Sequence, residues 1–82
     1  RGLGDVYKRQ VLGPPGCTVV FGSVGRELRG DLTVRLSYDG GQVLTQTVYP
    51  GRTFHFLLEG QVELEGLELL ARDGQSLGSW KP

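Results

Sequence analysis

The sequence predicts an all-β fold, a small antiparallel β-sandwich or partly open barrel of about six or seven short strands without long helices. Apolar and polar residues alternate between Cys17 and Trp80 with the period of half-buried strands. Turn signals made of Gly, Pro and Asp recur every 8–12 residues or so, as in sandwiches. The 14 glycines and four prolines suit many short strands joined by turns.

Length, charge and cysteine content restrict the class of protein. The 82 residues allow one small domain that buries only about 60–65% of its unfolded surface. Nine basic residues balance nine acidic ones, which argues against a nucleic-acid binder held by phosphate contacts. No apolar run approaches the roughly 18 residues of a membrane span. The single cysteine, Cys17, allows no internal disulfide and no zinc-ligand spacing, and we expect no cofactor.

Residues 1–10, RGLGDVYKRQ, match no pattern later in the chain. Asp5–Gln10, DVYKRQ, resembles the translation of GATGTGTATAAGAGACAG, most of the transposon mosaic end used to tag sequencing libraries. This resemblance implies a non-native leader, which is excluded from fold reasoning. The alternative is a genuine basic N-terminal arm. With the missing initiator Met, the leader predicts that the chain is a fragment of a larger protein.

Val11–Gly16, VLGPPG, reads as a turn or linker, since Pro lacks an N–H donor and Gly favours a bend. Residues 17–82 then form a single sandwich domain. Its first strand is CTVVF, in which we read Cys17 as a small buried hydrophobic residue. The predicted core comprises Val19, Phe21, Leu32, Val34, Leu36, Phe54, Phe56, Leu67 and Leu69.

The central segment Leu32–Tyr49 reads as two strands around Asp39-Gly40-Gly41. A two-residue loop places Val43, Thr45, Thr47 and Tyr49 on the face of Leu32, Val34 and Leu36. A three-residue loop places Leu44, Gln46 and Val48 there, because a slip of one residue exchanges the faces. We favour the three-residue loop because it gathers the threonines and Arg35 on one polar face.

The later strands follow the same alternation. The Tyr49–Arg52 turn predicts a bulged connection or a crossing to a second sheet. In Thr53–Glu59, one face carries Phe54, Phe56 and Leu58, and the other carries His55 and Leu57. The apolar phase of Gln61–Arg72 slips at Gly66, which indicates a β-bulge or a corner. Asp73-Gly74-Gln75 then turns the chain into a last strand, Ser76–Trp80.

Few residues are candidates for chemistry. Glu63 and Glu65 share a predicted strand face about 7 Å apart and are candidate Ca²⁺ ligands. The alternative is a solvated face that discourages pairing between sheet edges. Trp80, Tyr38 and Tyr49 are candidates for stacking on a sugar ring, or else rim and core residues. His55 is the only histidine and lies mid-strand without a nucleophile elbow, so we predict no catalytic residues and no enzyme.

From Val20 to Trp80 the order of features resembles carboxypeptidase-regulatory or transthyretin-like β-sandwich domains. Gly22-Ser23-Val24 matches the opening G-x-V strand, and Val34-Arg35-Leu36 matches the following V-x-L strand. Gly51–Phe56 stands in for the G-x-F-x-F element, with Pro50-Gly51 in place of the usual Asp-Gly. Leu69–Leu77 resembles the closing D-x-x-G-x-x-L. The resemblance implies a non-catalytic module attached to an enzyme, a receptor or a surface protein.

Three functions remain open at this point. The first is an accessory or interaction module whose partners are other domains of a parent protein or another protein. The second is a carbohydrate- or calcium-binding module. The third is part of an enzyme whose catalytic residues lie outside this chain. We expect no nucleic-acid partner and no membrane span. Sandwiches of this kind are often extracytoplasmic, but the sequence carries neither a signal peptide nor disulfides to support that location.

Overall fold

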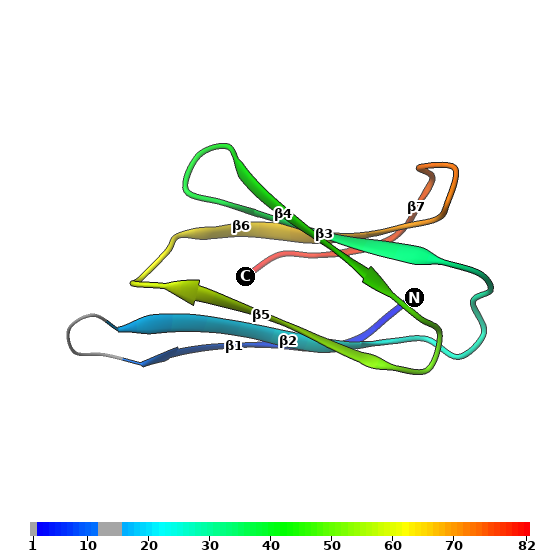
Figure 1. Cartoon of the computed structure of the whole chain (residues 1–82), viewed down its shortest axis with the longest axis horizontal. Helices are drawn as coiled ribbons and strands as arrows, with labels where there is room; N and C mark the ends of the chain where they lie inside the picture. Colours follow the sequence, from blue (N-terminus) through cyan, green and yellow to red (C-terminus); the bar gives the residue numbers. More distant parts are fainter. Residues whose placement is uncertain (1, 12–15) are drawn as a thin grey trace.

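The computed structural model describes residues 2–11 and 16–82 and forms two antiparallel sheets packed face to face (Figure 1). One sheet, sheet A, has the strand order β1-β2-β5, and the other, sheet B, has the order β4-β3-β6-β7. The seven strands are β1 (Leu3–Val11), β2 (Cys17–Val24), β3 (Leu32–Tyr38), β4 (Gln42–Val48), β5 (Thr53–Glu59), β6 (Leu64–Leu70) and β7 (Ser76–Trp80). The predicted all-β sandwich is confirmed, with no helix in the described residues.

The described residues contain no helix long and apolar enough to cross a membrane. Most of the predicted linker, Val11–Gly16, lies outside them.

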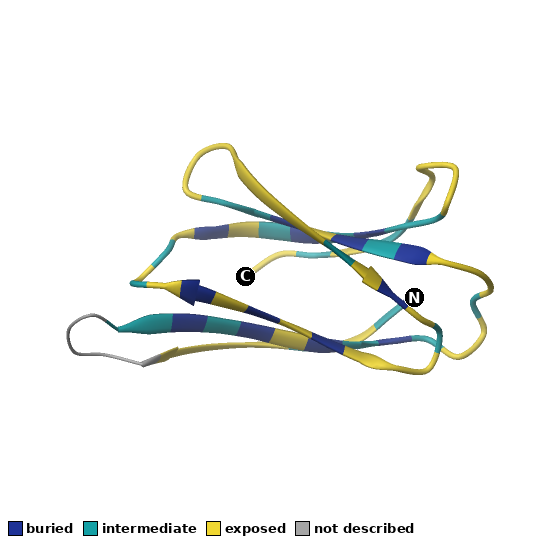
Figure 2. Ribbon diagram, in the orientation of Figure 1, coloured by how far each residue is buried: buried dark blue, intermediate teal, exposed yellow. Residues whose placement is uncertain are grey.

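The core lies between the sheets, where one side of each central strand is buried (Figure 2). In β5 burial alternates strictly, with Phe54, Phe56 and Leu58 inward and His55 and Leu57 exposed, as predicted. The buried core residues are Val20, Val24, Leu32, Val34, Leu36, Val48, Phe54, Phe56, Leu58, Leu64, Leu67 and Leu69. Seven of the nine predicted core residues are among them.

The two wrong core predictions, Val19 and Phe21, both lie in β2. Thr18, Val20, Gly22 and Val24 face inward, while Val19 is only partly buried and Phe21 is 40% exposed. Cys17 is partly buried rather than a core residue.

Thr18 and Gly22 explain why β2 takes this phase. The Thr18 hydroxyl donates to the Gly60 carbonyl at 3.0 Å and accepts from the Val62 amide at 3.3 Å, so this buried polar group is satisfied. A Cβ on Gly22 would lie 2.7 Å from the Phe54 ring, so the missing side chain makes room for that ring. Local alternation cannot reveal either interaction.

The β3–β4 hairpin takes the favoured register. Leu36 pairs with Leu44, Val34 with Gln46 and Leu32 with Val48, which confirms the three-residue loop. Asp39 and Gly40 have φ angles of 49° and 70°, as the primed hairpin turns require. Gly41, at φ 132°, adds the third loop residue.

The predicted inward Gln46 spans the two sheets. Its amide donates to the His55 carbonyl of β5 at 2.9 Å, which links edge strand β4 to edge strand β5. The Tyr49–Arg52 turn joins the same two strands, so it carries the chain from sheet B to sheet A, one of the two predicted outcomes. The Arg52 amide donates to the Tyr49 carbonyl at 3.1 Å, and Gly51 has a φ angle of 76°.

A β-bulge in β6 accounts for the phase slip at Gly66. Ser37 pairs with Gly66 and Tyr38 with Leu64, so Glu65 is the extra residue. Leu64 and Leu67 are therefore both buried although three positions separate them. Of the two predicted alternatives, the bulge is confirmed.

The N-terminal segment that resembles a non-native leader forms part of the sandwich from Gly2 onward. Strand β1 pairs with β2 from Leu3 opposite Val24 to Val11 opposite Cys17, with a shift of register between Leu3 and Val6. Gly2 is buried, and a Cβ there would lie 2.9 Å from both Leu69 Cδ2 and the Leu77 carbonyl oxygen. The start of β1 thus closes one side of the sandwich against β7.

Deletion of residues 1–10 tests the contribution of β1. We expect it to lower the free energy of unfolding by about 2–3 kcal/mol, because the half-buried Leu3 and Val6 side chains leave the core and uncover β2. Chemical denaturation of both chains measures the difference. A loss of about 0.5 kcal/mol or less would instead agree with a dispensable leader.

Phe56→Ala tests the core. Phe56 is 5% exposed and packs edge-to-face against Phe54, with ring centroids 6.2 Å apart. We expect a loss of about 3–5 kcal/mol in the free energy of unfolding. The matched control, Leu57→Ala, changes the adjacent residue, which is 68% exposed, and should shift stability by about 0.5 kcal/mol or less. Equal melting temperatures for the two variants would contradict the placement of Phe56.

Candidate functional site

The outer face of sheet A carries a group of exposed apolar side chains, Tyr7, Phe21 and Leu57. Strand register places Tyr7 of β1, Phe21 of β2 and His55 of β5 in one row across this face. The next row holds Arg9, Val19 and Leu57. Directly opposed residues of antiparallel strands project from the same face, so these side chains are neighbours.

Tyr7 and Phe21 form the centre of this face, which we call the sheet A patch together with Val19 and Leu57. Their rings stack with centroids 5.3 Å apart at an interplanar angle of 27°. Tyr7 is 53%, Phe21 40% and Leu57 68% exposed. Next to the ring pair lies an open hollow of about 470 Å³, whose lining includes His55 and Asp5. The patch offers aromatic and aliphatic contact surface with a polar rim.

The outer face of sheet B has the opposite character. Thr33 pairs with Thr47, and Arg35 pairs with Thr45 on one side and Glu68 on the other. This face is therefore polar across β3 and β6, as a water-facing sheet surface normally is, and its exposed apolar side chain is Val43 of the edge strand β4.

Sequence reasoning missed the sheet A patch, although a signal was present. In CTVVF of β2 and FHFLLE of β5, apolar residues stand at consecutive positions rather than strictly alternating. Strands with apolar residues on both faces are typical of sheets covered on both sides. The sequence analysis took the apolar Val19 and Phe21 as core residues, whereas they lie on the outer face of sheet A.

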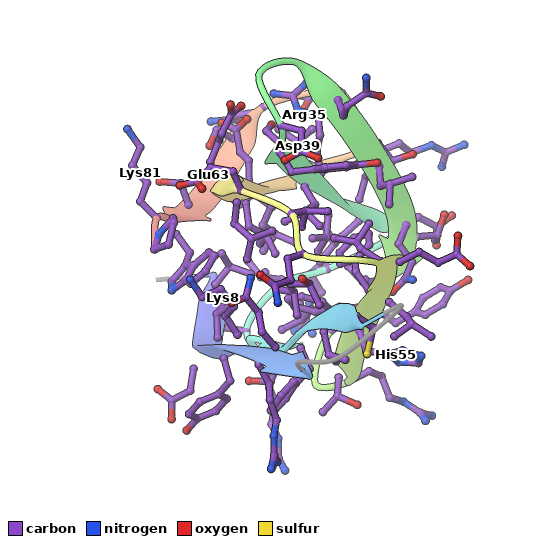
Figure 3. All side chains as sticks on the ribbon, turned by 90° about the vertical axis from the view of Figure 1, so that its left-hand side faces the viewer. Lys8, Arg35, Asp39, His55, Glu63 and Lys81 are labelled. Atoms are coloured by element: carbon purple, nitrogen blue, oxygen red, sulfur yellow. The ribbon has the colours of Figure 1, made fainter. Side chains whose placement is uncertain are left out.

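His55 and Cys17 share the outer face of sheet A but do not meet. His55 lies opposite Phe21, and Phe21 is four residues from Cys17 along β2. Four residues of strand correspond to about 13 Å, too far for a nucleophile–base pair. In the view along the strands the labelled His55 points away from the core into solvent (Figure 3). This geometry does not assemble a Cys–His dyad.

Glu63 and Glu65, the candidate calcium ligands, lie beside the β3–β4 hairpin turn rather than on one strand face. The Glu65 carboxylate accepts from the Gly40 amide at 2.6 Å. The Asp39 carboxylate accepts from the Glu63 amide at 2.8 Å, and the Asp39 amide donates to the Glu63 carbonyl at 2.9 Å. Figure 3 shows Asp39 and Glu63 side by side. These acids fasten the hairpin tip to the entry of β6.

In the part of the chain that the structure describes, no group of three or more His, Cys, Asp or Glu side chains lies close enough to hold a metal ion.

The three aromatic candidates do not converge. Tyr38 and Trp80 are partly buried and pack against the core from the ends of β3 and β7. Tyr49 is 54% exposed and follows β4 at the opposite end of the hairpin from Tyr38. About seven residues of strand, or roughly 23 Å, separate the two tyrosines. They do not form one stacking platform.

Glu68 of β6 lies on the outer face of sheet B, beside Arg35 of β3. Hydrogen bonds from Ser76 and then from Arg35 lower the pKa of the Glu68 carboxyl from its ordinary value of 4.5, and partial desolvation opposes them. The Arg35 Nη2–Glu68 Oε1 distance is 2.5 Å. This surface ion pair joins β3 to β6.

Comparison with family models, with curated proteins and with solved structures finds no match to this chain.

Ser76→Ala and Arg35→Gln test the cause of the shift. Both should raise the pKa of Glu68 toward 4.5, Ser76→Ala because it removes a hydrogen bond to the carboxylate and Arg35→Gln because it removes a positive charge beside the carboxylate. A lowered folded-state pKa stabilises the protein above the unfolded-state pKa, and that stability is lost as pH falls through the folded-state pKa. NMR titration of the Glu68 carboxyl measures its pKa in the original chain and in each variant. An unchanged pKa in Ser76→Ala would contradict this assignment.

Proposed function

We propose that this chain is a non-catalytic accessory module of a larger protein and that it docks onto a neighbouring domain through the sheet A patch. The exposure of Phe21 and Leu57 on a sheet face that also carries Tyr7 is the observation that carries the proposal. Contiguous exposed apolar patches on small proteins mark interaction sites, whereas single exposed residues need no explanation.

The chemistry of the patch favours an apolar protein surface as its target. Tyr7 and Phe21 supply flat aromatic area, and Leu57 supplies an aliphatic contact in the adjacent row. Arg9 and Glu59 lie toward the periphery of the same face. An apolar centre with a polar rim is the usual composition of protein–protein interfaces.

The remaining features of the chain agree with an accessory role. His55 and Cys17 are too far apart to act together, and Glu63 and Glu65 flank hydrogen bonds that fasten a turn. The order of sequence features resembles transthyretin-like domains, which serve as appended modules. A small sandwich of this kind supplies a rigid surface while the chemistry resides in the parent protein.

Thiol reactivity at position 57 tests the proposal. Leu57→Cys in a Cys17→Ser background places the only thiol on the exposed outer face of sheet A, in the row next to the Tyr7–Phe21 pair. We expect maleimide to react readily with the 82-residue chain and at least about tenfold more slowly when the chain is extended to its full genomic reading frame. Tenfold protection corresponds to a docking free energy of only about 1.4 kcal/mol.

Thr33→Cys in the same background is the matched control, because Thr33 lies on the polar outer face of sheet B. It should react at similar rates in the short and the extended protein. Equal reactivity of the Leu57→Cys thiol in both proteins would contradict docking through this face. Protection of both thiols would indicate general enclosure of the module instead of docking through the sheet A patch.

A further inference from the structure

The outer edge of β4 is an open hydrogen-bonding edge in the described part of the chain. Strand β4 ends one side of sheet B and pairs only with β3. Its seven residues, QVLTQTV, include no charge, no Pro and no Gly. Charged residues and Pro are the usual devices that keep sheet edges from pairing with other strands.

The other three edge strands are protected in ways that β4 is not. Strand β1 carries Asp5, Lys8 and Arg9, and β5 carries His55 and Glu59. Strand β7 is five residues long, and the start of β1 covers it where Gly2 lies against Gly78. Only β4 combines an uncharged sequence with an uncovered edge among the described strands.

Strand β4 also exposes apolar side chains on both of its faces. Val43, on the outer face, is 49% exposed, and Leu44, on the inner side, is 38% exposed. Figure 1 shows β4 running obliquely across the sandwich from the hairpin tip toward β5. Most of the strand is therefore exposed, as Figure 2 shows, and it is buried only at Val48.

We propose that a second copy of this chain pairs with the edge of β4, antiparallel to it, so that two four-stranded sheets B join into one across a twofold axis. A twofold axis at Thr45, the middle residue of β4, pairs all seven residues. Thr45 then faces its own copy, Val43 faces Thr47, and Leu44 faces Gln46. Each pair joins outer-face to outer-face or inner-face to inner-face residues, as an isologous contact requires.

Charge favours a second copy as the occupant. Strand β4 brings no charge to the edge, so two copies meet without like-charge repulsion. The nearest charged side chain in the central row is Arg35, which is paired with Glu68. Across the joined sheets the two Arg35 residues would lie three strand spacings, about 14 Å, apart, which is beyond the Debye length at 0.1 M salt.

The contact is independent of the proposed docking function. It uses an edge of sheet B, whereas the sheet A patch lies on the outer face of sheet A. A single strand pairing buries less area than the roughly 1,200–2,000 Å² of standard stable interfaces. We therefore expect a monomer–dimer equilibrium that depends on protein concentration.

Disulfide trapping of the full chain tests the contact and its register. Thr45→Cys in the Cys17→Ser background places two thiols directly opposite each other, where Cα atoms lie about 4.5–5.5 Å apart and a disulfide can form. Val43→Cys is the matched control on the same edge, because its two copies would lie about 13 Å apart. We expect mild oxidation to yield a covalent dimer at least about tenfold faster from Thr45→Cys than from Val43→Cys.

Sedimentation equilibrium over a range of concentrations tests the association without a crosslink. The average mass of the unmodified chain should rise toward twice the monomer mass. Thr45→Lys should raise the dimer dissociation constant at least about tenfold, because it sets two ammonium groups opposite each other. Ser79→Lys, on the opposite edge strand β7, should leave it unchanged.

Two results would overturn the proposal. The first is equal crosslinking of the two cysteine variants. The second is a monomer at every concentration, and binding of an added β4 peptide by that monomer would assign the edge to an extended peptide instead of a second copy.

Discussion

The buried hydroxyl of Thr18 is the interaction on which the surface of sheet A depends. It bridges the Gly60 carbonyl and the Val62 amide, and this requires Thr18 to face the core. Because side chains alternate along a strand, fixing Thr18 inward also fixes Phe21 outward. The hydrogen bonds of the buried Thr18 hydroxyl thus determine that the Phe21 ring lies on the outer face of sheet A.

The sandwich closes differently along its two sides. On one side the chain brings Gly2 against Gly78 of β7, where the absence of side chains permits close backbone approach. On the other side, among the residues that the structure describes, the Gln46 amide and the Tyr49–Arg52 turn link β4 to β5. Strand β4 is therefore held mainly by its hydrogen bonds to β3, which leaves its second edge open.

These features give a small protein two separate surfaces suited to association. The sheet A patch is a two-dimensional apolar face whose energetics depend on burial of Phe21 and Leu57. The β4 edge is a row of backbone donors and acceptors, where geometry and register matter more than area. The acids at the hairpin tip, Asp39, Glu63 and Glu65, form hydrogen bonds that hold the turn.

The sequence alone determined the elements that local chemistry controls. The alternation of apolar and polar residues predicted β3 and β5. Asp39-Gly40-Gly41 predicted the hairpin, and the phase slip at Gly66 predicted the bulge. Each of these signals lies within one or two strands. The sequence did not reveal a strand in residues 1–10, since β1 is held by pairing with β2 and exposes most of its side chains.

The candidate site was decided by tertiary structure. Val19, Val20 and Phe21 are consecutive apolar residues, so alternation alone allows either Val20 or its two neighbours to face the core. The choice depends on Thr18 meeting Gly60, 42 residues later, and on Gly22 admitting the Phe54 ring. Such long-range contacts leave no local trace in the sequence, and only the folded chain shows which apolar face remains in water.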